Sequence, residues 1–463
     1  MRPITLQFIR DVCRGELLSG GGDIVVERVC TDSRQAGPGD LFIAVEGEHF
    51  DAHAFINDVA AKKAAAILIS NTKVPGILPK CGVVTVGNTR QALGELAAAY
   101  RREFRLPVIA VGGSNGKTTA KELIASLLRQ RFNTHFSPAS FNNDIGVPLT
   151  LLGLEHTHGA AVVEVGTNHP GELEPLVRMI QPGYGVITSI GREHLEFFGD
   201  LTGVAHEEGV LAELLPADGK LFINGDTEQV GNVVSRSKAS VVKVGFGPFN
   251  AWRALNIRIA ENGMSFEVSA PVPGFCGQYQ LPLLGRHQVV NALLAMAVAV
   301  ELGLTRDEVQ AGLATCRPAK MRLQLSTIRD VRVLDDAYNA NADSMRAALE
   351  TLHELPCRGR RVAVLGDMAE LGAHGEAAHE EVGRSAAELG VRQLFAVGKM
   401  APVMGRAARA AGLDQVMEFN DVELAGRAVR SYLQPGDVVL LKASRATRME
   451  RIGDLLRSNE DVK

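Results

Sequence analysis

A lysine and a threonine at the end of a glycine-rich turn carry the clearest chemical signal in the chain. Lys117 and Thr118 close the stretch 112–118, whose sequence is Gly-Gly-Ser-Asn-Gly-Lys-Thr. In such turns glycines let backbone N–H groups approach phosphate oxygens, the lysine reaches the β- and γ-phosphates, and the threonine hydroxyl binds Mg²⁺. The apolar run 106–111 precedes the turn and a helical pattern follows it, which predicts a loop that binds a nucleoside triphosphate. The expected phosphate contacts are Gly112, Gly113, Ser114, Asn115, Gly116, Lys117 and Thr118.

One position departs from the usual phosphate-loop pattern. The pattern has a glycine where this chain has Val111, ahead of Gly116. The alternative interpretation is a glycine-rich turn that carries a lysine by chance. Because Gly-Lys-Thr-Thr stands between a strand pattern and a helix pattern, the phosphate loop is the favoured interpretation.

Two further side chains with metal-binding chemistry follow apolar runs. Glu164 lies near the end of the run 160–165, where a carboxylate can hold Mg²⁺ directly or through water. His194 follows the run 184–190 and can bind a metal or a phosphate. Because ligands bind beyond the carboxyl ends of parallel strands, both side chains are expected near the phosphate loop. The alternatives are a solvated acid and a structural histidine, and they weigh less for Glu164 than for His194.

Several other polar residues can contact a substrate or simply shape the chain. Ser33 and Arg34 can clamp a phosphate, because arginine offers a bidentate fork, although a surface turn explains their spacing better. Asn142 and Asn143 lie in a polar loop before a helix, where they can bind polar substrate groups or serve the turn. Asn291 lies on an Ala- and Leu-rich helix and can hydrogen-bond a base edge or act as an interior cap.

The composition limits the class of protein. The chain has 463 residues, of which 46% are hydrophobic and 22% charged, and its formal net charge is −4. A protein that mainly neutralises nucleic-acid phosphates would be strongly basic, so we expect no nucleic-acid partner. The 6 cysteines contain no C-x-x-C pair, which is typical of a reducing compartment. We find no signal peptide and no apolar run that could span a bilayer, so we expect a cytoplasmic protein without membrane insertion. We also expect a monomer.

The pattern of turns and apolar runs divides the chain into three units, because its length exceeds what one hydrophobic core supports. Their expected ranges are 1–105, 106–316 and 317–463. All three alternate strand and helix patterns, so the expected fold class is α/β with three domains.

Each unit has its own expected strands. In the mixed α/β first unit they are 64–69 and 83–86. The central unit alternates buried runs with helices, which favours a mostly parallel sheet flanked by helices, followed by a β-rich insertion at 250–284. Its expected strands are 106–111, 160–165, 184–190, 220–224 and 241–245. The third unit is Rossmann-like but lacks G-x-G-x-x-G. Its expected strands are 332–336, 361–368 with the turn included, 394–397 and 437–441.

Taken together, these residues resemble those of the Mur ligase family, the ATP-dependent amide ligases that assemble the peptidoglycan precursor. The resemblance covers nearly the whole chain and all three units. It rests on the loop 113–118, Glu164 after an apolar strand, His194 with Leu195, Arg322 after the central unit, and Asp336 at the first strand of the third unit. Two longer stretches, 335–345 and 365–372, are similar to those of the family members that add D-alanyl-D-alanine.

The resemblance implies a role for each part of the chain. It implies a ligase that uses ATP and Mg²⁺ to join D-alanyl-D-alanine to UDP-N-acetylmuramoyl-tripeptide through an acyl phosphate. The first unit would bind the UDP-sugar, the central unit ATP, and the third unit the incoming dipeptide. The implied substrate contacts are Ser33, Arg34, Asn142, Asn143, Tyr338, Asn339 and Asn341. The implied nucleotide contacts beyond the phosphate loop are His287, Asn291 and Asp336. The implied catalytic residues are Lys117, Glu164, His194 and Arg322, and the implied metal ligands are Thr118, Glu164 and His194.

Three positions depart mildly from the family's usual residues. Gly112 stands in place of a threonine, and Met321 in place of a glycine before Arg322. Ala342 stands in place of a proline, a change that the following helix should tolerate.

The departure at Glu208 is sharper. The family usually has there a lysine, carbamylated on its amine, whose carbamate bridges towards a second Mg²⁺. No lysine occurs between Lys121 and Lys220, so a shifted alignment does not supply one. We therefore expect Glu208 to be a catalytic residue and metal ligand that carries the same charge and the same hard oxygen atoms as the carbamate. Its arm is shorter, so a water bridge or a displaced helix is needed. The alternative is an acid on the helix surface.

Three competing functions make distinct demands on the sequence. A phosphate-loop switch protein such as a GTPase would carry an Asn-Lys-x-Asp motif, and the chain has none. A ligase of the same family with another acceptor, such as a folate-type glutamate ligase, would lack the Asp-Ser-Arg turn that ends at Arg34. An inactive relative is the third alternative, because the lysine is missing.

Overall fold

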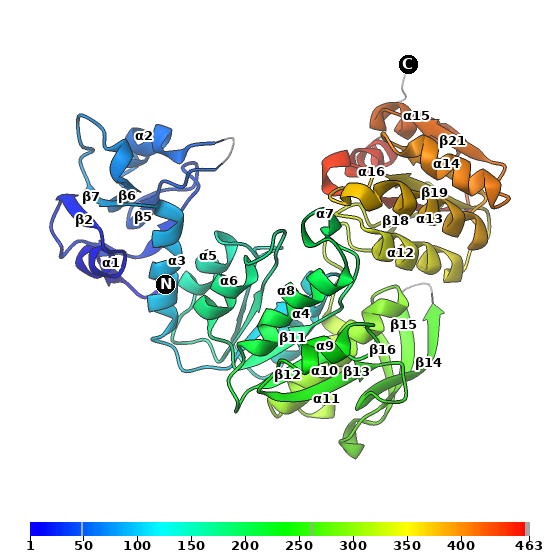
Figure 1. Ribbon diagram of the computed structural model, residues 1–463, viewed down its shortest axis with the longest axis horizontal. Helices are drawn as coiled ribbons and strands as arrows, with labels where there is room; N and C mark the ends of the chain where they lie inside the picture. Colours follow the sequence, from blue (N-terminus) through cyan, green and yellow to red (C-terminus); the bar gives the residue numbers. More distant parts are fainter. Residues whose placement is uncertain (48–49, 261–262, 459–463) are drawn as a thin grey trace. The chain divides into compact units, whose positions relative to one another are not determined.

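The computed structural model describes residues 1–47, 50–260 and 263–458 of an α/β protein, and Figure 1 shows its ribbon coloured along the sequence. Contacts between residues divide the chain into two compact units. The first comprises Met1–Val111, Phe132–Thr167 and Glu172–Tyr184, and the second comprises Gly112–Arg131, Asn168–Gly171 and Gly185–Lys463. The last residues of the expected third domain, 459–463, and residues 261–262 of the expected insertion lie outside the described part.

A five-stranded sheet forms the N-terminal part of the first unit. Its strand order is β2-β7-β6-β5-β4, and all neighbours are parallel except the edge strand β2. The strands are β2 Glu16–Ser19, β4 Arg28–Cys30, β5 Asp40–Ile43, β6 Ala66–Ser70 and β7 Gly82–Val86. Strands β5, β6 and β7 are buried along their whole length, as expected for parallel strands covered on both faces. The helices of this part are α1 Leu6–Val12, α2 Ile56–Ala61 and α3 Thr89–Arg101, and a small antiparallel pair joins β1 Ile4–Thr5 to β3 Val25–Val26.

Three parallel strands complete the first unit and carry its best candidate acid. Strand β10 (Ala160–Glu164) pairs with β8 (Val108–Gly112) on one side and with β9 (Thr134–Phe136) on the other. Glu164 is the last residue of β10, so its side chain lies at the carboxyl end of the strand. Helices α5 (Gly146–Leu152) and α6 (Leu173–Ile180) pack against α3.

The second unit begins with the helix that follows the phosphate loop. Helix α4 (Lys117–Leu128) packs against α10 (Arg286–Glu301) and α11 (Arg306–Thr315). Six strands lie side by side in chain order, and they change from parallel pairing at β12, β13 and β14 to antiparallel pairing at β14, β15 and β16. They are β11 Tyr184–Ile187, β12 Lys220–Asn224, β13 Ser240–Gly245, β14 Trp252–Ala260, β15 Gly263–Ser269 and β16 Gly277–Leu281. The remaining helices are α7 Leu195–Phe198, α8 Leu201–Glu213 and α9 Val230–Val234.

The C-terminal part of the second unit is a six-stranded sheet with helices on both faces. Its order is β17-β18-β22-β19-β20-β21, and all neighbours are parallel except the edge strand β17. The strands are β17 Gln324–Ile328, β18 Val331–Asp335, β19 Arg361–Gly366, β20 Gln393–Val397, β21 Val416–Phe419 and β22 Val438–Lys442. Alternate strand residues pack on helices α12 (Ala342–Glu354), α13 (Gly375–Glu388) and α14 (Ala401–Ala410) on one face. The other residues pack on α15 (Val422–Tyr432) and α16 (Glu450–Arg457).

All predicted strands are present, and their bounds shift by at most two residues except at 184–190. Strands β1 to β5 and β9 were not predicted, because each has no more than four residues and its apolar run is too short to stand out. The expected strand 184–190 ends at Ile187, because residues 188–191 turn to support the phosphate loop. Strands β17 and β21 were not predicted, since both are partly exposed edge strands without a run of buried apolar residues. The insertion expected at 250–284 is present as β14, β15 and β16.

Candidate active site

The predicted phosphate loop follows β8 and needs glycine at two positions. Gly113 has a φ of +109°, and a Cβ there would lie 2.5 Å from the hydroxyl oxygen of Thr188. Gly116 has a φ of +91°, and a Cβ there would lie 2.9 Å from the side-chain amide of Asn291. Both values of φ lie in the region that favours glycine. The loop therefore takes its shape from local backbone freedom and from the close approach of two other segments.

The segment after β11 supports the loop through hydrogen bonds. The N–H of Ser114 donates to the carbonyl of Ser189 over 2.9 Å, and the N–H of Asn115 donates to the Ser189 hydroxyl over 3.0 Å. In return, the N–H of Gly191 donates to the hydroxyl of Ser114 over 2.8 Å. These bonds bring residues 192–194 close to the loop.

Lys117 folds back onto its own loop. Its Nζ donates to the carbonyl of Gly113 over 2.5 Å and to that of Ser114 over 3.3 Å. The same Nζ lies 3.6 Å from a carboxylate oxygen of Glu193. The ammonium group is thus placed between loop carbonyls and a buried acid, at the start of α4, where phosphate oxygens would be bound.

Glu208 lies against the phosphate loop and is only 1% exposed. It projects from α8, and its Oε2 accepts a hydrogen bond of 2.7 Å from the N–H of Gly113. Its other oxygen, Oε1, is buried and has no hydrogen-bond partner among the described residues. Burial, reinforced by the nearby Glu193 and opposed by Lys117, raises the pKa of Glu208 to about 8. The alternative of an acid on the helix surface is therefore wrong.

Glu193 is a site residue that the sequence analysis missed. It is 7% exposed, its Oε2 faces Lys117, and its Oε1 is buried without a hydrogen-bond partner among the described residues. It lies close enough to Glu208 to raise the pKa of that carboxyl group. An acid directly before a candidate histidine was the available signal, but adjacency in sequence does not indicate burial.

His194 is held in place by an acid from the C-terminal part of the unit. Its backbone has a φ of +48°, and its Nδ1 lies 2.5 Å from Oε2 of Glu370. The hydrogen bond with His194 is the main cause that lowers the pKa of Glu370. Since Nδ1 faces Glu370, the other nitrogen, Nε2, points towards Glu193, whose Oε2 is 3.9 Å away. A carboxylate that orients a histidine in this way is common at metal and phosphate sites.

The C-terminal part of the unit is also joined to the loop region by Arg192. Its guanidinium donates to Asp343 over 2.7 and 2.9 Å and to Glu381 over 2.6 and 2.9 Å. The Asn341 amide donates to the side-chain oxygen of Asn115, in the phosphate loop, over 3.0 Å. Asn341 also caps α12, so its side chain joins the helix start to the loop.

The remaining predicted residues of the third domain lie at the carboxyl ends of β18 and β22. The guanidinium of Arg322 stacks on the ring of Tyr338, 4.1 Å from its centroid. Lys442 was not singled out from the sequence; it is 2% exposed and donates to Asp336 over 2.6 Å and to the carbonyl of Asn339 over 3.0 Å. A lysine that ends an apolar strand was the signal for it.

Two predicted residues of the nucleotide site lie on α10. Burial lowers the pKa of His287, which therefore favours its neutral form. Asn291 is 3% exposed, donates to the side chain of Gln288 over 2.8 Å, and faces Gly116 of the loop. Its amide therefore packs inside the protein against the phosphate loop.

Glu164 and Asn142 lie together in the first unit. Glu164 is 1% exposed, and its Oε1 accepts a hydrogen bond of 2.9 Å from the Asn142 amide. The side-chain oxygen of Asn143 accepts from the N–H of Gly146 over 2.9 Å, at the first residue of α5. Asn142 is thus tied to a candidate metal ligand, and the side chain of Asn143 also supports the turn.

Ser33 and Arg34 lie in an exposed turn after β4. The Arg34 guanidinium pairs with Asp32 over 2.8 and 2.9 Å, and its side chain is 88% exposed. Lys62 donates to the carbonyl of Ser33 over 2.8 Å. Two cationic side chains therefore lie at this turn.

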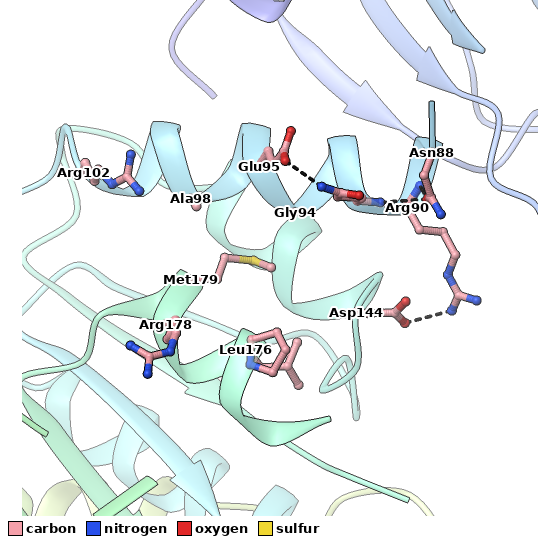
Figure 2. A pocket seen from close by; sticks show the side chains of 12 residues that line it. Asn88, Arg90, Gly94, Glu95, Ala98, Arg102, Asp144, Leu176, Arg178 and Met179 are labelled. Carbon is pink, nitrogen blue, oxygen red and sulfur yellow. Dashed lines mark hydrogen bonds and ion pairs between the residues drawn. The ribbon is translucent and has the colours of Figure 1, made fainter. Parts of the chain in front are cut away.

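The first unit also has a hollow of about 510 Å³ between α3 and α6, which Figure 2 shows from close by. Gly94, Leu176 and Met179 line it, and Arg90 pairs with Asp144 over 2.8 Å at its side. None of its lining residues is a predicted site residue.

The donor atoms beside the loop suit a divalent cation. Among the described residues no three acidic, histidine or cysteine side chains are arranged to hold a metal by themselves. Mg²⁺, however, takes only one or two carboxylates from most proteins and its other ligands from phosphates and water. The buried carboxyl oxygens of Glu193 and Glu208 are hard ligands of that kind.

None of the helices in the described ranges combines the length and apolar character needed to cross a membrane.

Comparison with known proteins identifies the family. Three sequence profiles match the chain in succession: the Mur ligase family catalytic domain at residues 25–101, the Mur ligase middle domain at 111–299, and the Mur ligase glutamate ligase domain at 321–445. The UDP-N-acetylmuramoyl-tripeptide–D-alanyl-D-alanine ligase of Escherichia coli (strain K12) is 37% identical over 466 residues, which cover 99% of each chain. The chain belongs to the Mur ligase family.

Solved structures of Mur ligases share this fold. MurF from Acinetobacter baumannii superposes with a TM-score of 0.90 at 31% identity, over 99% of this chain and 100% of that one. MurF from Thermotoga maritima, solved in complex with ADP, superposes with a TM-score of 0.80 at 25% identity, over 93% of this chain and 97% of that one. The predictions of the family and of a three-domain α/β Mur ligase fold are therefore confirmed.

Proposed function

We propose that this Mur ligase joins D-alanyl-D-alanine to UDP-N-acetylmuramoyl-tripeptide at the expense of ATP and so completes the peptide of the peptidoglycan precursor. The observation that carries the proposal is the hydrogen bond between Asn341 and Asn115. It joins the segment expected to receive the dipeptide to the loop expected to hold the γ-phosphate. The named activity of the Escherichia coli relative, which is similar along its whole length, supports the same acceptor.

The reaction has to bring anions together. The terminal carboxylate of the tripeptide attacks the γ-phosphate of ATP and yields an acyl phosphate and ADP, and the amine of the dipeptide then displaces phosphate. Lys117 leaves its loop carbonyls to neutralise the phosphates, and Arg322 adds a second positive charge. Arg192 holds the C-terminal part over the site and helps to exclude water from the acyl phosphate. Bound Mg²⁺ would supply charge neutralisation of the phosphate oxygens.

We assign the other roles as follows. Thr118, Glu164, His194 and Glu208 are the metal ligands, with Glu208 in place of a carbamylated lysine. The UDP-sugar is bound by residues 1–105, ATP by 106–316 and the dipeptide by 317–463. The further substrate contacts are Ser33, Arg34, Asn142, Asn143, Tyr338, Asn339 and Asn341, and the further nucleotide contacts are His287, Asn291 and Asp336. The protein acts as a monomer in the cytoplasm, where ATP and UDP-linked precursors are found.

Phosphate release from ATP tests the proposal. We expect release only when UDP-N-acetylmuramoyl-tripeptide and D-alanyl-D-alanine are both present, with one peptide bond formed per phosphate. Separate reactions with L-alanyl-L-alanine and with glutamate control for the acceptor. Release that does not need the dipeptide, or none with both substrates, would contradict the proposed function.

A further inference from the structure

The hollow between α3 and α6 is a cavity of ligand size within the first unit. Its volume of about 510 Å³ lies in the range of pockets that hold small molecules. The side chains at its centre are small or apolar: Gly94 and Ala98 come from α3, and Leu176 and Met179 come from α6. A Cβ at Gly94 would lie 3.0 Å from the terminal methyl carbon of Met179, so the two helices approach closely at this point. The floor of the hollow is therefore apolar and lies between two packed helices.

One end of the hollow carries two arginines, one from each helix. Figure 2 shows Arg102 of α3 and Arg178 of α6 on the same side of Met179. Arg102 is exposed, and its guanidinium has no ion pair or hydrogen bond within the described ranges. Arg178 pairs with Glu174 of its own helix, but its side chain is 62% exposed, and such a pair contributes little. Both guanidinium groups are therefore available to an anion.

The acids that line the hollow already have partners. The carboxylate of Asp144 pairs with Arg90 over 2.8 Å, and that of Glu95 accepts a hydrogen bond of 2.9 Å from the amide of Gln91. Figure 2 shows the pair of Arg90 and Asp144 at the end away from the two arginines. An acidic group would be repelled by Asp144 at that end, so it would be drawn to the opposite one.

We propose that this hollow binds a small amphiphilic anion, whose carboxylate or phosphate pairs with Arg102 and Arg178 and whose apolar body covers Leu176 and Met179. Guanidinium groups bind both kinds of anion through paired N–H donors. The apolar floor favours a hydrocarbon or aromatic body, since removing such a surface from water is favourable. None of the lining residues has a role in the proposed ligase function, so this proposal stands independently of it.

The occupant must have both an acidic group and an apolar body to use the whole site. An inorganic anion would leave the apolar floor exposed to water, and a neutral apolar molecule would leave the two arginines without a partner. A cation would be repelled by the arginines. The size of the hollow suits a single soluble molecule rather than a lipid surface.

Titration calorimetry with octyl phosphate tests the site in the full-length protein. The ligand is kept below its critical micelle concentration, and saturating ADP is present throughout so that the nucleotide site is occupied. We expect one molecule of octyl phosphate to bind. We expect inorganic phosphate and 1-octanol each to bind at least about tenfold more weakly, because each lacks one half of the interaction.

Substitutions locate the bound molecule. Arg102→Ala and Arg178→Ala should each weaken the binding of octyl phosphate about tenfold, because each removes one charged donor. Ala98→Trp should abolish it by filling the hollow. Arg105→Ala is the matched control, since Arg105 is also an exposed arginine close to the end of α3 but does not line the hollow. This variant should bind octyl phosphate like the wild type.

Three results would overturn the proposal. They are no binding of octyl phosphate by the wild type, binding of 1-octanol as tight as that of octyl phosphate, and wild-type affinity in both arginine variants. If circular dichroism shows that Ala98→Trp does not fold, Arg102→Glu takes its place, because an exposed position tolerates the change. Wild-type affinity in Arg102→Glu would also overturn the proposal. Sedimentation with phosphatidic acid vesicles, without binding of octyl phosphate, would point to a lipid surface instead and refute a soluble ligand.

Discussion

Replacing Glu208 by glutamine should stabilise the protein in alkaline but not in acidic solution when nucleotide and divalent cations are absent. Burial raises the pKa of this carboxyl group from 4.5 to about 8. A raised pKa means that the folded protein holds the proton more tightly than the unfolded chain does. Stability is therefore fully present below the unfolded pKa and is lost as the pH rises through the folded pKa. Glutamine cannot ionise and keeps an oxygen for the N–H of Gly113.

The size of the effect follows from the two pKa values. Each pH unit between them corresponds to about 1.4 kcal/mol, so ionisation at pH 8 costs at most about 4 kcal/mol. Half of this limit, about 2 kcal/mol, would raise Tm by about 4–8 °C for a domain of this kind. The cost falls on Glu208 because its side chain is almost fully buried and lies close to Glu193.

The pH-dependent difference in stability is measured by thermal melting of both proteins in EDTA between pH 5 and pH 8. We expect Tm of Glu208→Gln to be close to that of the wild type at pH 5 and to exceed it by several degrees at pH 8. Glu196→Gln should follow the wild type at every pH, because its side chain is exposed. A difference in Tm that does not grow with pH would refute the assignment of a buried, costly charge to Glu208.

Three further substitutions test the contacts that assemble the site. Arg192→Lys replaces a fork that binds two acids by a single ammonium, and it should lower the free energy of unfolding by about 1 kcal/mol, measured by urea denaturation, because the groups are partly exposed. Glu370→Ala should lower kcat about tenfold with little change in KM for ATP, and Glu370→Gln should restore much of it, since an amide oxygen can still orient His194. Gly113→Ala should abolish ADP binding, measured by calorimetry, because its φ of +109° and the nearby Thr188 leave no room for a Cβ.

Each of these has a control and a contradicting result. Arg346 forms an exposed ion pair within one helix, so Arg346→Lys should leave the urea midpoint unchanged. If Arg192→Lys also left the midpoint unchanged, the structural role given to Arg192 would be wrong. Loss of kcat in Glu370→Gln as large as in Glu370→Ala would show that orientation of His194 is not the cause. Gly87→Ala introduces a Cβ into open space and should bind ADP normally. Normal binding by Gly113→Ala as well would refute the steric argument.

Local patterns predicted those parts of the site that depend on neighbours in sequence. The glycines around Lys117 were predicted because a loop that wraps phosphate needs positive φ values, and only the local chain supplies them. Glu164 was predicted at the end of β10 because an acid interrupts an apolar run there. The edge strands β17 and β21 escaped prediction, because partial exposure removes the apolar run on which the prediction depends.

Local sequence patterns could not show which side chains are buried or which of them pair with distant residues. Glu193 stood beside a candidate histidine but was not singled out, and Lys442 directly follows the expected strand 437–441 and was not singled out either. Both are at least nine-tenths buried, and burial depends on what the rest of the chain packs over them. The side chain of Asn341, which is expected to contact the dipeptide, also joins the cap of α12 to Asn115. That contact spans 226 residues of sequence, so no local pattern could indicate it.

The sequence by itself determined the phosphate loop, the α/β fold class, the family and the absence of a lysine where the family carries one. These follow from residue types and short spacings, which act through backbone freedom and the periodicity of apolar side chains. Only the tertiary structure decided that Glu208 is buried against Gly113, 95 residues away, and that Glu193 lies beside the ammonium group of Lys117. The cost of a buried charge depends on every group around it, and those groups are brought together only when the chain has folded.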